Sequence, residues 1–177
     1  MRQSSVAINP GTPKRDAAGN LYVPFGDLST KLATNRSGSW QSTTLPIVGG
    51  WRMDLAPDGT AHFVELRNGA NWYRVVAPDG QVTSTDLTAD LNGLLVDGVA
   101  LLPDGRLAIL VRDNATPLRI RATDGTITPM DLGLGGAETV YYLSAVHATP
   151  AGQLDVFYLG QVGSPYKMRR AYLDVVP

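Results

Sequence analysis

The chain has 177 residues, and its 15 Lys and Arg against 16 Asp and Glu give a formal net charge of −1. A charge near zero argues against a nucleic-acid partner, which usually demands a basic face. The absence of cysteine excludes disulfides, thiolate metal sites and cysteine nucleophiles. We expect one domain over residues 1–177, with no membrane span and no visible signal peptide, and the localisation stays open.

A repeated hairpin pattern runs along the chain. In each copy, alternating apolar residues lead into a glycine turn and continue after it, and the turn glycines, 40, 46 and 47 residues apart, are Gly19, Gly59, Gly105 and Gly152. A second hairpin follows the first three copies 19, 21 and 20 residues later, with turn glycines Gly38, Gly80 and Gly125. Asp-Gly pairs at 58–59, 79–80, 104–105 and 124–125 predict two-residue turns, because glycine adopts a positive φ at little cost.

Each repeat predicts four short antiparallel strands in a unit of about 40–47 residues, which is typical of a β-propeller blade. The predicted blades cover residues 4–47, 48–92, 93–136 and 137–177. Helical signal is confined to residues 86–92 and suffices for one turn. The predicted fold class is therefore all-β, a propeller of four blades, with a β-sandwich built from the same hairpins as the alternative.

Several segments resemble the repeats of bacterial propellers of the sialidase or BNR-like kind. They read "DAAGNLYVPFGDLSTKLATNRSGSW", "APDGTAHFVEL" and "LPDGRLAILV". The resemblance covers most of the chain and implies the propeller fold. It implies no activity, because the Ser-x-Asp-x-Gly-x-x-Trp box of sialidases and a recognisable arginine triad are absent from the sequence. No sialidase catalytic residue is therefore carried over.

The fourth blade is predicted to lack its outer strand. In the second and third blades this strand lies about 27 residues after the turn glycine, whereas the same offset from Gly152 falls beyond the last residue, Pro177. A closed ring with one three-stranded blade is the favoured explanation, and a piece of a longer propeller or a ring made by two copies are the alternatives. Because an exposed strand edge is a pairing site, self-association through the last blade is also expected to be possible.

Two columns of the aligned repeats hold polar residues where other repeats have alanine. If the protein is an enzyme, the candidates for general acid–base catalysis in these columns are His147, His62 and Asp54. Two-residue turns would place His62 opposite Leu55 and His147 opposite Val156, so neither blade is expected to hold a ready His–Asp pair. A contact across the axis between blades two and four would supply one. The alternative is a buried histidine that bonds to the backbone or to water.

A second candidate set lies on the leading loops, the segments 48–54, 92–98 and 136–144 that lead into the inner strands. In a propeller these loops gather at one mouth of the central channel, which is the default binding pocket. Aromatic rings beside fixed charges suit a sugar or a peptide side chain, although the rings could instead fill the channel as core. The ligand-binding residues predicted at this mouth are Trp51, Arg52, Asp54, Asp97, Glu138, Tyr141, Tyr142 and Ser144.

The favoured functional hypothesis is a non-enzymatic, lectin-like binding module that presents a carbohydrate- or protein-binding site at the channel mouth. The alternatives are a propeller hydrolase or lyase that acts at the central axis, and a part of a larger propeller. With two histidines, no cysteine and no phosphate-binding loop, we expect neither a metal nor a cofactor.

Overall fold

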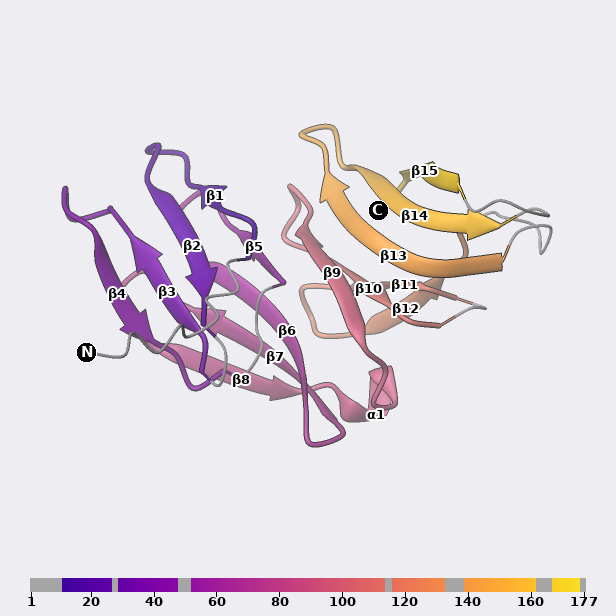
Figure 1. The fold of residues 1–177 in the computed structure, drawn as a ribbon, viewed down its shortest axis with the longest axis horizontal. Helices are drawn as coiled ribbons and strands as arrows, with labels where there is room; N and C mark the ends of the chain where they lie inside the picture. Colours follow the sequence, from indigo (N-terminus) through magenta and orange to yellow (C-terminus); the bar gives the residue numbers. More distant parts are fainter. Residues whose placement is uncertain are drawn as a thin grey trace, which may run out of the picture.

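The computed structural model of the chain describes residues 11–26, 29–47, 52–113, 116–132, 139–161 and 167–175. Almost all regular structure is strand, and the strands form four antiparallel sheets that follow one another along the chain (Figure 1). The first sheet contains β1 (Lys14–Arg15), β2 (Leu21–Phe25), β3 (Lys31–Thr34) and β4 (Gln41–Thr44). The second contains β5 (Met53–Leu55), β6 (Ala61–Arg67), β7 (Ala70–Val76) and β8 (Val82–Asp86). The third contains β9 (Val96–Leu101), β10 (Leu107–Val111), β11 (Leu118–Arg121) and β12 (Ile127–Met130), and the fourth contains β13 (Thr139–Ala148), β14 (Gln153–Gln161) and β15 (Lys167–Asp174).

This architecture confirms the predicted propeller of four blades, the last of which has three strands. Each sheet falls within one of the predicted blades. The helical signal is also confirmed as a single short helix, α1 (Thr88–Leu91), which follows the last strand of the second sheet.

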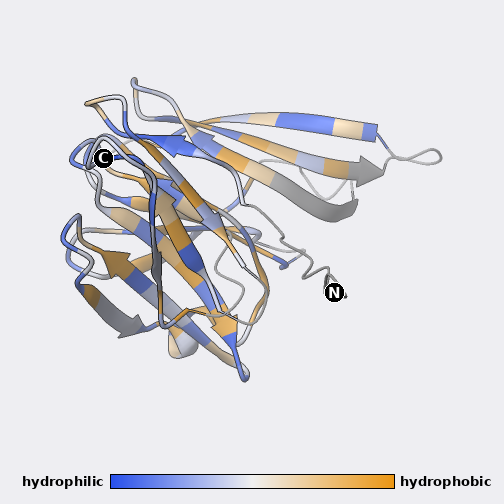
Figure 2. Cartoon of the chain, turned by 60° about the vertical axis from the view of Figure 1, so that its left-hand side comes forward, coloured by the Kyte–Doolittle hydropathy of each residue, from blue (hydrophilic) through white to orange (hydrophobic). Residues whose placement is uncertain are grey.

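Hydrophobic cores separate successive sheets. One cluster, which includes Phe63 and Met53, lies between the first and second sheets, a second lies between the second and third, and a third lies between the third and fourth. Sheet three is therefore buried on both faces, and all five residues of β10 are buried. Burial in β15 instead alternates along the strand, with Met168 63% and Tyr172 54% exposed. Figure 2 shows how hydrophobic and hydrophilic residues are distributed along the strands. Closure of a ring between the fourth and first sheets stays a prediction.

The hairpin turns differ from the prediction of two-residue turns. In the second sheet Leu55 pairs with Ala61, the N–H of Gly59 donates to the carbonyl oxygen of Ala56, and Gly59 has a φ of 91°. This is the three-residue loop in which proline and aspartate form a type I turn and glycine takes the left-handed position. Ala56 also donates its N–H to the carbonyl oxygen of Thr60, and the same two backbone hydrogen bonds recur in the turns at Gly80, Gly105, Gly125 and Gly152.

A true two-residue turn occurs elsewhere. It joins β6 to β7 at Asn68 and Gly69, whose φ angles are 52° and 80°, and it pairs Arg67 with Ala70. Positive φ at both central residues is what a type I′ turn requires.

One cross-strand position repeats in all four sheets with different occupants. It pairs the inner strand with its neighbour and is filled by Asp54 and His62 in the second sheet and by Ala100 and Ala108 in the third. Both alanines are fully buried in the core that faces the fourth sheet. Near them Gly98 lies so close to Val146 that a β-carbon on the glycine would be 3.2 Å from the valine side chain. The third and fourth sheets are thus in close contact at this level.

Candidate functional site

The candidate acid–base residues face one another within each sheet, which corrects the predicted register. Asp54 pairs directly with His62, and His147 pairs directly with Asp155. The prediction that they diverge to opposite faces is wrong because the turns have three residues and not two. Since side chains alternate with a period of two along a strand, a change of one residue in the pairing moves each side chain to the other face.

Asp54 holds three sheets together. Its Oδ1 lies 2.8 Å from Nζ of Lys14 in the first sheet, and its Oδ2 accepts a hydrogen bond of 2.7 Å from the backbone N–H of Leu101 in the third. Lys14 pairs with Tyr22 and so occupies in the first sheet the position that Asp54 has in the second. Both carboxylate oxygens of Asp54 are therefore engaged, so Asp54 positions the strands that carry Lys14 and Leu101 and attracts the positive charge of Lys14.

His62 is fixed through one ring nitrogen. Its Nδ1 lies 2.7 Å from the hydroxyl of Tyr73, and the two rings are stacked with their centroids 6.0 Å apart. Burial lowers the pKa of His62 below its usual 6.5, with Arg121 acting in the same direction and the carboxylates of Asp54 and Asp58 acting against it. Burial also raises the pKa of Tyr73, so its hydroxyl stays protonated at neutral pH. The remaining ring nitrogen, Nε2, is the one left for a ligand.

Arg121 completes this group from the third sheet. Its guanidinium lies 4.6 Å from the centroid of the Tyr73 ring, a cation–π contact. His62, Tyr73 and Arg121 therefore meet at the boundary between the second and third sheets.

His147 has a different environment. It is exposed, whereas its cross-strand partner Asp155 is buried and accepts hydrogen bonds from Nε and Nη2 of Arg170 at 2.7 and 2.8 Å. The bonds from Arg170 lower the pKa of Asp155, and the nearby imidazole of His147 adds to the effect. Asp155 is thus an ionised carboxylate, held by Arg170, on the strand position directly opposite the exposed His147.

Both histidines line one pocket of about 560 Å³, here called the axial pocket. Its wall is formed by the hairpin ends of β5, β9 and β13, the innermost strands of three sheets, which in a propeller surround the central channel. Apart from the two imidazoles and Thr149 the wall is mostly apolar, with a proline from each hairpin: Pro57, Pro103 and Pro150. The pocket therefore combines a largely apolar surface with two imidazole rings from different sheets.

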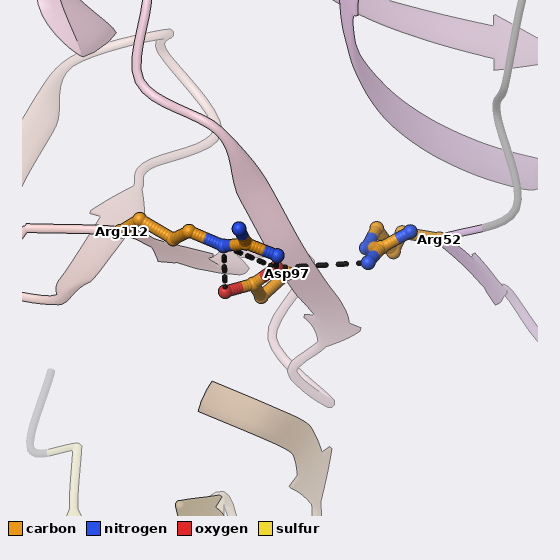
Figure 3. A network of polar contacts seen from close by, with 3 residues as sticks. All are labelled: Arg52, Asp97 and Arg112. Carbon is orange, nitrogen blue, oxygen red and sulfur yellow. Dashed lines mark hydrogen bonds and ion pairs between the residues drawn. The ribbon is translucent and has the colours of Figure 1, made fainter. Parts of the chain in front are cut away.

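A second polar group lies at the leading-loop end of the same sheets (Figure 3). Asp97 in β9, whose side chain is 3% exposed, receives Arg112 and Arg52 from two sides. Nε and Nη2 of Arg112 donate to the carboxylate at 2.9–3.1 Å, and Nη2 of Arg52 lies 3.6 Å from Oδ1. The structure thus brings Arg52 and Asp97, two of the predicted ligand-binding residues, together.

The other predicted residues of this mouth are not placed. Trp51 and Glu138 lie outside the described residues. Tyr141, Tyr142 and Ser144 belong to β13, of which only the backbone is described at these positions. Their ligand-binding role stays a prediction. Asp54, predicted for this mouth as well as for catalysis, lies instead between Lys14 and Leu101.

Several residues of these groups were missed by the sequence argument, among them Tyr73, Arg112, Arg121 and Arg170. Each lies on a strand or at a strand end, and the residues it contacts depend on the pairing register between strands. Alternation along β7 places Tyr73 among inward-facing residues, which would have been the available signal, but no sequence pattern pairs it with His62. Arg170 joins the group only through its hydrogen bonds to Asp155.

The described part of the chain offers neither a metal site nor a membrane-spanning helix. There, no group of three or more His, Asp or Glu side chains is arranged to hold a metal ion. The only helix described, α1, has four residues, and no helix in this part of the chain could cross a membrane.

No protein-family model and no curated protein matches the sequence. Solved structures do match. Virginiamycin B lyase from Staphylococcus aureus superposes with a TM-score of 0.62 at 13% identity, over 96% of this chain and 57% of the lyase. A streptogramin B lyase gives a TM-score of 0.61 at 15% identity, over 97% of this chain and 56% of that one.

A gluconolactonase-like protein gives a TM-score of 0.60 at 16% identity, over 99% of this chain and 66% of its own length. The chain therefore spans between 56% and 66% of these three structures. At identities this low the likeness concerns the fold and leaves activity open. The comparisons thus support the conclusion already reached from the sheets, that this chain has the β-propeller fold.

Proposed function

We propose that the chain contributes the acid–base site of a hydrolase or lyase that acts in the axial pocket. The observation that carries the proposal is that His62 and His147, which come from sheets two and four, line the same pocket. Acid–base chemistry needs one group that accepts a proton and another that donates one, both within reach of a bound molecule.

The two histidines have surroundings that suit different roles. Burial lowers the pKa of His62, so its imidazole is neutral at neutral pH and is able to accept a proton at Nε2. His147 is exposed, lines the pocket from the fourth sheet and lies opposite Asp155 across the strands, a carboxylate that can orient its ring. We therefore assign His62 as the base and His147 as the acid, with Tyr73 and Asp155 as positioning residues.

The mostly apolar wall suits a substrate with an apolar body and one or two polar groups at the reacting end. One structural neighbour offers a first compound to test. A catalytically inactive histidine-to-alanine variant of the S. aureus lyase was solved with quinupristin. Quinupristin therefore leads the panel of esters, lactones and cyclic peptides to be incubated with this protein.

The test compares the wild type with His62→Asn and His147→Asn, using product formation on that panel as the readout. Each replacement should lower the rate by about a hundred-fold, the usual scale of a lost acid or base. Arg67→Gln, which changes an exposed residue outside the pocket, should leave the rate unchanged. Turnover that persists in both histidine variants would remove the proposal, and binding without turnover by the wild type would favour a receptor.

A second candidate function is the binding module at the leading-loop mouth, with a carbohydrate or protein ligand. It is supported by the two partly exposed guanidinium groups of Arg52 and Arg112 that converge there. Loss of glycan or protein capture in Trp51→Ala and Tyr142→Ala variants would support this site, and unchanged capture would contradict it. The likeness to sialidase-type repeats stays a prediction and adds no residue to either site.

A further inference from the structure

The arginine pair at Asp97 has features that an ion pair between sheets does not need. A side-chain exposure of 39% for Arg52 and 44% for Arg112 leaves both guanidinium groups partly open to solvent, while the carboxylate between them is buried. The formal charges of these three side chains, two cations and one anion, sum to +1. Figure 3 shows the two side chains approaching Asp97 from different sides.

Arg52 makes little use of its hydrogen-bonding capacity. A guanidinium carries five N–H groups in a fixed fork, yet the contact of Arg52 with Asp97 is an ion pair at 3.6 Å, too long for a hydrogen bond. Its Nε is buried and has no hydrogen-bond partner among the described residues. Buried donors in folded proteins are nearly always satisfied, so an unmet donor in such a group calls for a functional explanation.

The contact with Asp97 has a second effect on geometry. Arg112 is held by both carboxylate oxygens, at 2.9–3.1 Å, and this fixes the plane of its guanidinium. An arginine held in this way loses little conformational freedom when a ligand binds, and arginine forks match the oxygen spacing of carboxylates and phosphates. Asp97 thereby positions a cationic site and does not merely neutralise it.

We infer that Arg52 and Arg112 form an anion-binding site at the leading-loop mouth, which takes a carboxylate or phosphate group of a ligand. The inference rests on the second candidate function and names the chemistry that its ligand would carry. It is independent of the axial pocket, because none of the three residues lines that pocket.

The test is a titration of ¹⁵N-labelled protein with inorganic phosphate and, separately, with acetate, followed by NMR of the arginine Nε–H signals. Sodium chloride at matched ionic strength is the reference. The Arg52 signal, assigned from its loss in Arg52→Gln, should shift and saturate with one or both anions. The two arms distinguish a tetrahedral from a planar ligand group.

Three variants make the result specific. Arg52→Gln should weaken binding, followed at the Arg112 signal, by about ten-fold, because a charged donor is lost. Asp97→Asn keeps an acceptor oxygen that can still hold Arg112 but removes the competing negative charge, so it should tighten binding by about three-fold. Arg67→Gln removes a similar charge from the exposed end of β6 and should change affinity by less than about two-fold.

Shifts that match those in chloride, or equal affinities in the wild type and Arg52→Gln, would overturn the inference. A folded Asp97→Asn protein with weaker anion binding would also contradict it. If the anions fail while capture of a glycan or protein still depends on Trp51 and Tyr142, the binding module stands without this site. Turnover in the axial pocket is measured separately and is unaffected by either result.

Discussion

The packing of the first two sheets predicts an unusual cost for one glycine substitution. Gly59 and Gly80 occupy the same position in equivalent turns, with φ angles of 91° and 89° and the same backbone hydrogen bond. A β-carbon on Gly80 would meet nothing within 4 Å, whereas one on Gly59 would lie 2.4 Å from the hydroxyl oxygen of Tyr22. Tyr22 is 3% exposed and cannot move freely.

The magnitudes follow from these contacts. Alanine in a left-handed conformation costs about 1–2 kcal/mol, so Gly80→Ala should lower the free energy of unfolding by that amount. Gly59→Ala carries the same cost plus about 1–3 kcal/mol for overpacking against the tyrosine. Replacing Tyr22 by Phe removes the clashing oxygen and leaves the ring carbon at 3.2 Å, so most of the added cost should disappear in the double variant.

Urea denaturation of the wild type, the two glycine variants, Tyr22→Phe and the Gly59→Ala/Tyr22→Phe pair measures the coupling directly. Tyr22→Phe alone should cost about 0.5–1.5 kcal/mol, since it loses the hydroxyl's 3.3 Å hydrogen bond to Asp16. The reasoning is refuted if Gly59→Ala and Gly80→Ala are equally destabilised. It is also refuted if the effects of Gly59→Ala and Tyr22→Phe simply add.

Three further predictions concern pH and association. Because burial lowers the pKa of His62, the unfolded chain binds a proton that the folded chain does not, so stability should fall as the pH drops below about 6.5. Urea unfolding at about pH 7.5 and about pH 5 should show a smaller loss in His62→Asn than in the wild type, and equal losses would contradict this. Arg170 lowers the pKa of Asp155, so the ionised Asp155 contributes stability above pH 3.8 that is lost on further acidification. Arg170→Gln should therefore reduce the loss of stability on acidification, measured as acid unfolding by circular dichroism. Self-association through the edge of β15 predicts a dimer in light scattering, and a monomer at every concentration would exclude it.

The sheets could be predicted from sequence because their signals are local. Alternating apolar residues and turn glycines repeat within each unit, so the four units and the short helix followed without knowledge of any long-range contact. The pairing register between the strands was predicted wrongly, because the Asp-Gly pairs predict two-residue turns whereas the Pro-Asp-Gly turns have three residues. Proline prefers the second position of a type I turn, and this preference at Pro57 could have indicated the three-residue loop.

The candidate sites needed information that is not local. His62 and His147 were singled out because alanine fills the same columns in other repeats, but their shared pocket depends on how three sheets are arranged. The contact of Tyr73 with His62 depends on register, and that of Arg112 with Asp97 depends on the turn of the chain after β10. Pairings of this kind have no pattern along the sequence, so the residues were found only in the structure.

The repeated cross-strand position also limits how such a protein can acquire new chemistry. In the third sheet the position is filled by Ala100 and Ala108, and at this level the sheet presses against its neighbour through Gly98. A histidine or aspartate there would have to force two sheets apart before it could act. The second sheet can carry Asp54 and His62 because polar partners receive them: Lys14 and Leu101 of the adjacent sheets bind Asp54, and Tyr73 of the same sheet bonds to His62. The room between adjacent sheets therefore limits where reactive side chains can be added at this position.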